Sequence, residues 1–304
     1  MGGGHGPLVV HTIHGPPFMP VEGSTLRRLK TRALNHAYTL AERRAARRCD
    51  RLVSVADAMT AQFLARGIGR PDQYVTIRSG METAPFLLAA PGQTRAEVRA
   101  RLGLSAADFV VGTVARLAEH KGHDDLLDAL AVDLRADPRL KLLWVGDGWW
   151  RERLLAKARA LGLATRELDT HDDSAGGGAP PQLLLTGLVA PDHIPGLIRA
   201  MDVLAHPSYR EGLPRTVPQA LLAGVCPVAY DVDGTGEICR DMQTGRLVPP
   251  GDVARLREAV AWCHANPGER RALAERGREA CRVAFSAETM VAELERVYAG
   301  GASG

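Results

Sequence analysis

The feature that most constrains this chain is a regular alternation of short apolar runs with amphipathic segments, which begins at Phe109. The runs are FVVGTVA, KLLWVG, QLLLTG, DVLAHPS and CPVAYDV, and helical patterns lie between them and after them. Strands that alternate with helices pair in parallel, because each helix returns the chain across one face of the sheet. The alternation therefore predicts an α/β fold whose parallel sheet is covered by helices on both faces.

The first part of the chain carries a similar pattern. Three strands are expected, at Leu8–Ile13, Asp50–Val55 and Tyr74–Ile77, and a long helical pattern fills residues 24–49. A length of 304 residues suits two domains. We expect these domains to join within residues 86–107.

The composition favours a cytoplasmic protein with a packed core. Apolar residues make up 45% of the chain, and no stretch approaches the roughly 18 consecutive apolar residues of a membrane span. The first residues lack the basic and apolar regions of a secretory signal. Five cysteines are scattered without any C-x-x-C spacing, which argues against a disulfide framework and against a zinc site.

Positive charge is concentrated near the start of the chain. The first 90 residues contain 12 Lys and Arg against 6 Asp and Glu, and nine of the basic residues lie between Arg27 and Arg51. Such a segment is either a solvated helix face or a surface that meets anionic lipid or a phosphorylated acceptor. Nucleic acid is not expected as a partner, because Tyr38 is the single aromatic residue in this segment and offers no stacking platform.

Several familiar site motifs are absent or incomplete. The dinucleotide pattern G-x-G-x-x-G fails twice, because Arg151 and Cys239 stand where the third glycine belongs. Neither a phosphate-loop motif nor a G-x-S-x-G motif occurs, which weakens the NTPase and α/β-hydrolase interpretations. Asp169, Asp172 and Asp173 lie in a Gly/Pro-rich stretch, so we expect a solvated loop there and no metal site.

Two loops that follow strands carry residues suited to a ligand that contains a diphosphate and a sugar. In ARLAEHKG, Arg116 and Lys121 stand at the mouth of the predicted sheet, just before a helix, where cations and helix N–H groups can cradle a diphosphate. The alternative for Lys121 is an ordinary solvated lysine. In HPSYREGLPRT, Glu211 is either a helix cap or a carboxylate that holds sugar hydroxyls. Gly212 beside it permits a close backbone approach to a ligand.

These stretches, together with VGDGWWRERLL, DVDGTGEI, TGRLVPPGD and FSAETMVAELERVY, resemble family 4 of the glycosyltransferases in order and spacing. The resemblance implies the GT-B fold, in which two Rossmann-like domains face each other across a cleft. It implies a first, acceptor-side domain over residues 1–105 and a donor-binding domain over residues 106–304. The last helix is expected to pack back on the first domain, and that domain is expected to lack its front part.

The resemblance also implies roles for individual residues. Arg116 and Lys121 match the residues that bind the donor diphosphate, and Glu211 matches the one that holds the transferred sugar. Gln219 stands where the family has a second glutamate on the nucleotide ribose, and its amide can still bond a diol, without charge. The implied catalytic residues are His14, Arg116, Lys121 and Glu211, and the implied substrate-binding residues are Gly212, Leu213, Thr216 and Gln219.

The expected activity is transfer of a sugar from a nucleotide sugar with retention of configuration, without a metal or any other cofactor. The donor is a UDP-, GDP- or ADP-sugar, and the acceptor is an envelope glycolipid or polysaccharide, with peripheral contact of residues 27–51 to the inner face of the membrane. The alternative is a non-catalytic fragment that only binds the nucleotide sugar. A sugar-nucleotide epimerase or a phosphorylase-like relative is a weaker interpretation, because no cofactor-lysine signature is found.

Overall fold

The computed structural model describes residues 7–19, 21, 24–168 and 181–300. The chain forms two compact units. The first contains residues 1–81, 211–213 and 284–304, and the second contains residues 82–210 and 214–283. Among the described residues, no helix has both the length and the apolar character needed to cross a membrane.

The first unit is built on a three-stranded parallel sheet in the order β1-β2-β3. Its strands are β1 (Val10–Ile13), β2 (Arg51–Ser54) and β3 (Tyr74–Thr76), and the crossovers are α1 (Thr25–Ala46) and α2 (Asp57–Ala65). The final helix, α12 (Ala287–Gly300), belongs to this unit. Its Val297 packs with Val53 and Ile77 in a small apolar cluster.

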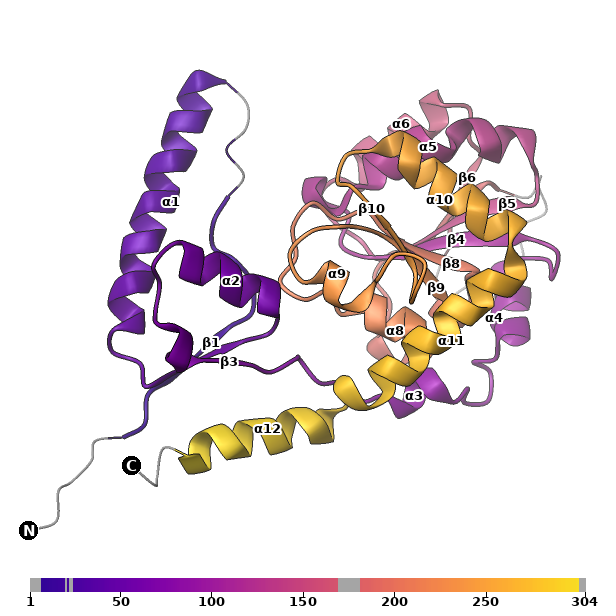
Figure 1. The fold of residues 1–304 in the computed structure, drawn as a ribbon. Helices are drawn as coiled ribbons and strands as arrows, with labels where there is room; N and C mark the ends of the chain where they lie inside the picture. The colour runs from indigo at the N-terminus through magenta and orange to yellow at the C-terminus, as the bar shows by residue number, and fades with distance from the viewer. Residues whose placement is uncertain (1–6, 20, 22–23, 169–180, 301–304) are drawn as a thin grey trace, which may run out of the picture. The chain divides into compact units, whose positions relative to one another are not determined.

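The second unit is built on a seven-stranded parallel sheet in the order β10-β9-β8-β4-β5-β7-β6 (Figure 1). The inner strands are buried, and all six residues of β5 are buried, as expected for a parallel sheet with both faces covered. The strands are β4 (Phe109–Val114), β5 (Leu140–Val145), β6 (Thr165–Glu167), β7 (Leu183–Leu185), β8 (Val203–His206), β9 (Cys226–Tyr230) and β10 (Arg246–Val248).

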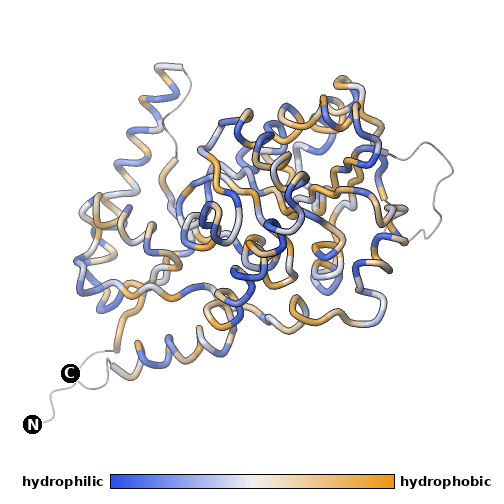
Figure 2. The backbone as a smooth tube through the Cα atoms, turned by 45° about the vertical axis from the view of Figure 1, so that its right-hand side comes forward, coloured by the Kyte–Doolittle hydropathy of each residue, from blue (hydrophilic) through white to orange (hydrophobic). Residues whose placement is uncertain are grey.

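Helices enclose this sheet, and the hydrophobic segments of the tube in Figure 2 run through the interior of the unit. The core joins side chains of the inner strands to the apolar faces of the helices on the sheet. The helices are α3 (Ala84–Leu87), α4 (Arg95–Leu102), α5 (His123–Ala136), α6 (Arg151–Ala160), α7 (Ile194–Ala200), α8 (Thr216–Leu222), α9 (Thr235–Ile238), α10 (Val253–Ala265) and α11 (Pro267–Ala284).

The structure confirms the predicted α/β class and the parallel sheet, and three of the elements that the apolar patterns do not predict are α4, β6 and β10. Helix α4 lies within the stretch expected to join the domains, where Thr94 and Glu97 form a reciprocal capping box. Strands β6 and β10 form the two edges of the large sheet and contain exposed or half-buried residues, so neither shows an apolar run. The predicted loop that begins at Asp169 lies outside the described residues.

Candidate functional site

The strand order of the large sheet locates a switch point between β4 and β8. From β4 the chain builds outward through β5 to one edge, and from β8 it builds through β9 to the other edge. The two strands lie side by side, with Val111 opposite Val203 and Gly112 opposite Leu204. In open parallel sheets, ligands bind beyond the carboxyl ends of the strands at such a point. The loops that follow β4 and β8 are the two that the sequence analysis singled out.

These two loops are bonded to each other through their backbones. The backbone N–H of Tyr209 donates to the carbonyl oxygen of His120 at 2.8 Å, and the hydroxyl of Ser208 donates to the same oxygen at 3.1 Å. Gly122 has φ +68°, and a Cβ there would lie 1.9 Å from the backbone oxygen of Pro207. Only glycine satisfies both the left-handed backbone and this close approach.

Arg116 lies on the loop after β4, and a third loop supports it from beside. The backbone N–H of Leu117 donates to the backbone carbonyl oxygen of Asp147 at 3.0 Å. The backbone N–H of Trp150 donates to the carbonyl oxygen of Leu117 at 3.1 Å. The exposed guanidinium of Arg116 lies 5.5 Å from the ring centroid of Trp149. Stacking on an aromatic face restricts a long side chain without neutralising it, so Arg116 remains a cation at the sheet mouth.

Lys121 ends a single helical turn immediately before α5, and its side chain is half-buried. The first turn of α5 carries two carboxylates that would oppose an anion if they were unpaired. One of them, Asp124, is bonded by Arg153 at 2.7 Å and by Lys157 at 3.0 Å. Although burial raises the pKa of Asp124, these hydrogen bonds hold it below its usual value.

The second carboxylate, Asp125, holds two tyrosines from the ends of neighbouring strands. One of its oxygens accepts the hydroxyl of Tyr209 at 2.5 Å and that of Tyr230 at 2.6 Å. The rings meet edge to face, with centroids 5.5 Å apart. Burial, and then the hydrogen bond to Asp125, raise the pKa of Tyr230. This clamp, here called the Asp125 clamp (Asp125, Tyr209 and Tyr230), was not predicted from the sequence. Its one signal is a tyrosine shortly after β8 and a tyrosine at the end of β9.

Thr216 and Gln219 lie on α8, which follows the second loop. The Thr216 hydroxyl lies 3.3 Å from Nδ1 of His206, the last residue of β8. Gln219 is half-buried and stands three residues further along, on the same side of the helix as Thr216. Both predicted residues therefore belong to the second unit, as do Arg116 and Lys121.

The remaining predicted residues belong to the first unit. His14 directly follows β1 and is exposed, and the segment Glu211–Leu213 groups with this unit. A Cβ added at Gly212 would lie 2.1 Å from the backbone oxygen of His14. The structure thus brings His14 together with Gly212. The assigned roles of these residues stay predictions.

A buried histidine lies at the start of α5. His123 is 2% exposed, and neither of its ring nitrogens has a hydrogen-bond partner within the described part of the chain. Its ring meets that of Trp144 edge-on at a centroid distance of 5.0 Å. Burial lowers the pKa of His123 to about 3, so the imidazole is neutral at physiological pH.

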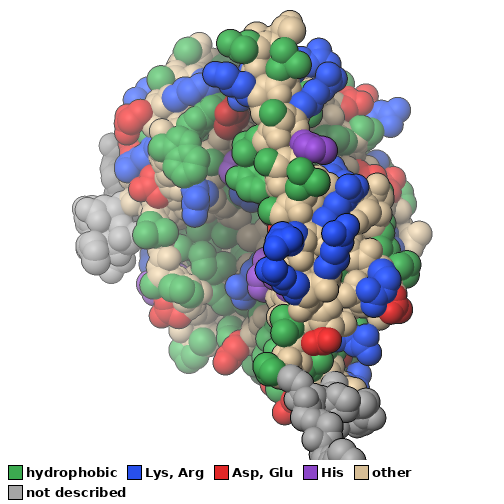
Figure 3. Space-filling model, turned by 90° about the vertical axis from the view of Figure 1, so that its left-hand side faces the viewer, with side chains coloured by type: hydrophobic (Ala, Val, Ile, Leu, Met, Phe, Trp, Pro, Cys, Tyr) green, Lys and Arg blue, Asp and Glu red, His purple; other side chains and the backbone are tan. Residues whose placement is uncertain are grey.

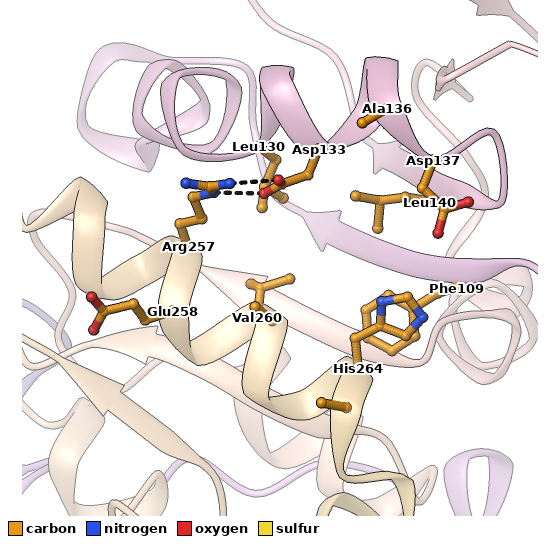
Figure 4. Close-up of a pocket in the computed structure, with 12 residues that line it drawn as sticks. Phe109, Leu130, Asp133, Ala136, Asp137, Leu140, Arg257, Glu258, Val260 and His264 are labelled. Atoms are coloured by element: carbon orange, nitrogen blue, oxygen red, sulfur yellow. Dashed lines mark hydrogen bonds and ion pairs between the residues drawn. The ribbon is translucent and has the colours of Figure 1, made fainter.

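A cavity of about 480 Å³ between α5 and α10 contains none of the predicted site residues (Figure 4). It lies at the amino ends of β4 and β5, since Phe109 and Leu140 line it. The candidate loops follow the carboxyl ends of the strands, at the other end of the sheet. Its wall is closed by a two-bond ion pair between Arg257 and Asp133 and by His264 stacked on Phe109. We assign the site to the loops, because the charged groups and the switch point coincide there.

No group of three or more His, Cys, Asp or Glu side chains placed to hold a metal ion occurs among the described residues. The three aspartates of the 169–180 segment are not among them. Metal-independent chemistry stays a prediction.

Comparisons with known proteins identify the family and the fold of the chain. Residues 108–266 match the family model described as glycosyl transferases group 1. The chain is 30% identical to 2-deoxystreptamine N-acetyl-D-glucosaminyltransferase of Streptomyces fradiae, over 98% of this chain and 69% of that protein. It is 31% identical to D-inositol 3-phosphate glycosyltransferase of Salinispora arenicola, over 86% of this chain and 57% of that protein.

Among solved structures, Anabaena HepE in complex with UDP superposes with a TM-score of 0.75 at 23% identity, covering 96% of this chain and 72% of HepE. This likeness shows the GT-B fold. The chain spans 69% and 57% of the length of the two curated relatives named above. On the family match and on the identity to the Streptomyces fradiae enzyme, the chain belongs to the group 1 glycosyl transferases.

Proposed function

We propose that this chain transfers a sugar from a UDP-sugar to a hydroxyl acceptor, with retention of configuration at the sugar. The observation that carries the proposal is the pair of backbone-bonded loops at the switch point between β4 and β8, which presents Arg116 and Lys121. Two cations at this position suit a ligand with two phosphates, because charge-assisted hydrogen bonds are stronger than neutral ones.

The chemistry assigned to these residues follows from where charge develops. As the bond between the sugar and the diphosphate breaks, negative charge grows on the departing phosphate, and cations fixed in advance stabilise it without reorganising. Arg116 and Lys121 are assigned this role. Glu211 is assigned to the hydroxyls of the transferred sugar, and the Gln219 amide to the ribose diol. His14 is assigned to the sugar or the leaving group.

The choice of UDP rests on the relatives. HepE was solved with UDP and with UDP-glucose, and two enzymes of Streptomyces are named for transfer of N-acetylglucosamine and of glucose. We infer a UDP-linked glucose or N-acetylglucosamine as the donor. No metal or further cofactor is proposed.

Two classes of acceptor remain in the proposal. The first is an envelope glycolipid or polysaccharide. The second is a small cyclitol, because relatives are named for transfer to 2-deoxystreptamine and to D-inositol 3-phosphate. An acceptor assay therefore begins with these cyclitols and with a lipid extract.

For the lipid acceptor, α1 is the proposed membrane contact. Among its described side chains only Ala46 is buried, and its basic residues alternate with exposed apolar ones. Figure 3 views the side on which α1 lies in Figure 1 and shows Lys and Arg side chains gathered beside hydrophobic ones. Amphipathic helices of this composition bind anionic lipid surfaces peripherally. The exposed apolar residues of α1 are Leu26, Leu29, Leu34, Tyr38 and Leu40.

Vesicle flotation tests the membrane contact. The protein is expected to float with vesicles that contain phosphatidylglycerol, and Leu29→Glu/Leu40→Glu is expected to abolish this. The matched control is Leu188→Glu/Val283→Glu, which changes two exposed apolar residues outside α1. Equal flotation of both double variants contradicts the assignment to α1.

Turnover tests the activity itself. The purified chain is incubated with UDP-glucose or UDP-N-acetylglucosamine and each acceptor, and released UDP and glycosylated product are measured. Product that depends on both substrates supports the proposal. Tight UDP binding without transfer or donor hydrolysis supports instead the non-catalytic fragment that binds the nucleotide sugar.

A further inference from the structure

A second charged cavity lies in the same unit as the loops after β4 and β8, here called the UDP loops, but at the amino ends of the strands. Its volume is about 310 Å³, and four arginines line it, with Asp202 as the single carboxylate in the lining. Asp202 immediately precedes β8 and the lining segment 223–225 immediately precedes β9, so the cavity lies at the amino ends of these strands. The four arginines, here called the arginine pocket, are Arg95, Arg199, Arg270 and Arg271.

The single carboxylate is already engaged on both of its oxygens. Asp202 accepts from Arg95 at 2.8 Å and from Arg270 at 3.2 Å on one oxygen, and from Arg99 at 2.6 Å on the other. The backbone N–H of Val110 also donates to it, at 2.9 Å. The side chains of Asp202, Arg99 and Arg270 are 10%, 4% and 13% exposed, whereas that of Arg95 is 42% exposed and reaches solvent. One charge is therefore shared among three guanidiniums.

The other two arginines of the pocket have no carboxylate partner within the described residues. Arg199 donates from one terminal nitrogen to the carbonyl oxygens of Pro85 and Leu88, and Arg271 donates through Nε to the carbonyl oxygen of Pro267. Carbonyl oxygens orient a guanidinium but do not neutralise it. The second terminal nitrogen of Arg199 is buried and has no described hydrogen-bond partner.

The pKa values of two arginines reflect the same excess of positive charge. Burial lowers the pKa of Arg95, and the neighbouring charges of Arg99 and Arg270 lower it further, against the effect of Asp202. Burial also lowers the pKa of Arg199, and so does the charge of Arg278. A bound anion would relieve both effects, because an opposite charge favours the charged form of an arginine.

We propose that the arginine pocket binds a small soluble molecule that carries a diphosphate or a phosphate monoester, at a site separate from the UDP loops. Planar guanidiniums match the oxygens of phosphate in paired hydrogen bonds, which a lysine cluster does not reproduce. The volume suits a diphosphate ion or a sugar phosphate and is at the small end of ligand pockets. The ligand would bind at the amino ends of the strands, whereas the reaction is proposed at their carboxyl ends. The ligand would therefore be an effector and not a substrate.

The experiment separates this pocket from the UDP loops by variants. Inorganic diphosphate and glucose 1-phosphate are titrated calorimetrically into the Arg116→Ala/Lys121→Ala chain, so that the loops do not contribute. Adding Arg199→Gln/Arg271→Gln is expected to weaken binding of at least one probe tenfold or more. Adding Arg255→Gln/Arg282→Gln, two exposed arginines outside the pocket, is expected to change it less than twofold.

The single variant Arg271→Gln protects the test against a folding defect, because this exposed side chain bonds only within its own helix. It is expected to weaken the same probe at least threefold, with an unchanged Tm. Three results overturn the proposal: no binding by the folded loop variant, equal binding after the pocket substitutions, or binding only to vesicles that contain phosphatidic acid. None of these results bears on UDP binding, which is measured separately on the unsubstituted chain.

Discussion

Asp125 illustrates how a single carboxylate fixes the loop that leads to Glu211. It accepts two phenolic hydroxyls on one oxygen, from Tyr209 in that loop and from Tyr230 at the end of β9. Hydrogen bonds to a charged acceptor contribute about 1.5–3 kcal/mol each, and Tyr230 is fully buried. Removal of the carboxylate leaves a buried hydroxyl without this partner and removes the bond between the Tyr209 side chain and α5, while the bonds of Tyr209 and Ser208 to His120 remain.

We predict that Asp125→Leu lowers the free energy of unfolding by about 2–4 kcal/mol and weakens UDP binding about tenfold. Asp125→Asn, which keeps an accepting oxygen, is expected to lose less than half as much stability. Urea unfolding and calorimetry measure the two effects. The control is Asp128→Leu, which removes an exposed carboxylate of the same helix that pairs with Lys157. Equal losses for Asp125→Leu and Asp128→Leu would show that the clamp does not hold the loop.

His123 makes stability depend on pH in a definite direction. Its pKa is about 3 in the folded protein and 6.5 in an ordinary environment, so the unfolded chain takes up the proton first as the pH falls. Stability is therefore lost as the pH falls from about 6.5 toward 3, by up to about 1.4 kcal/mol per pH unit.

We predict that His123→Leu removes this component, so that the variant gains stability relative to the unsubstituted protein as the pH is lowered from 7 to 4.5. Urea unfolding at several pH values measures the difference between the two proteins. His193→Leu changes an exposed histidine and serves as the control, with no such gain expected. A pH-independent difference for His123→Leu contradicts the neutral, buried imidazole.

At the level of elements, the junction of the two site loops depends on one glycine. Gly122 caps α5 with a left-handed backbone while the Pro207 carbonyl occupies the space where a Cβ would stand. Gly92 has a comparable φ of +77° but nothing within 4 Å of its added Cβ. An alanine at Gly92 would cause backbone strain alone, whereas an alanine at Gly122 would cause backbone strain and also disrupt the contact between the loops.

We predict that Gly122→Ala destabilises the protein by about 3 kcal/mol or more and weakens UDP binding, because the loops must move apart. Gly92→Ala is expected to cost only the strain of the left-handed backbone, about 1–2 kcal/mol, with normal UDP binding. Thermal unfolding and calorimetry compare them. Equal behaviour of the two variants would mean that the loop contact contributes nothing.

The elements also show what sequence patterns can predict. Inner strands such as β5 form long apolar runs, so they are visible in the sequence. The edge strands β6 and β10 bury little and leave no such run, and α4 is signalled only by the capping pair Thr94 and Glu97. Burial on one face or none weakens the periodic signal from which elements are inferred.

At the scale of the whole molecule, the order of the strands decides which loops meet. The sequence predicts loops after β4 and β8 with suitable residues, but their adjacency depends on the pairing of Val111 with Val203, about 90 residues later. The family resemblance assigns residues of both loops to one donor, and the sheet order shows that the strands before these loops are neighbours. The Asp125 clamp and the contact between Arg116 and Trp149 depend on side chains from elements that are distant in the sequence, which no local pattern encodes.

The central claim is that the loops after β4 and β8 bind the diphosphate of UDP. Calorimetric titration of UDP into the purified chain and into Arg116→Ala/Lys121→Ala tests it most directly, with Arg255→Ala/Arg282→Ala as the control for lost surface charge. Two charge-assisted contacts of about 1.5–3 kcal/mol each predict that the loop variant binds UDP at least about 100-fold more weakly while the control binds normally. Unchanged affinity in the folded loop variant, or no UDP binding by the folded unsubstituted chain, would contradict the claim.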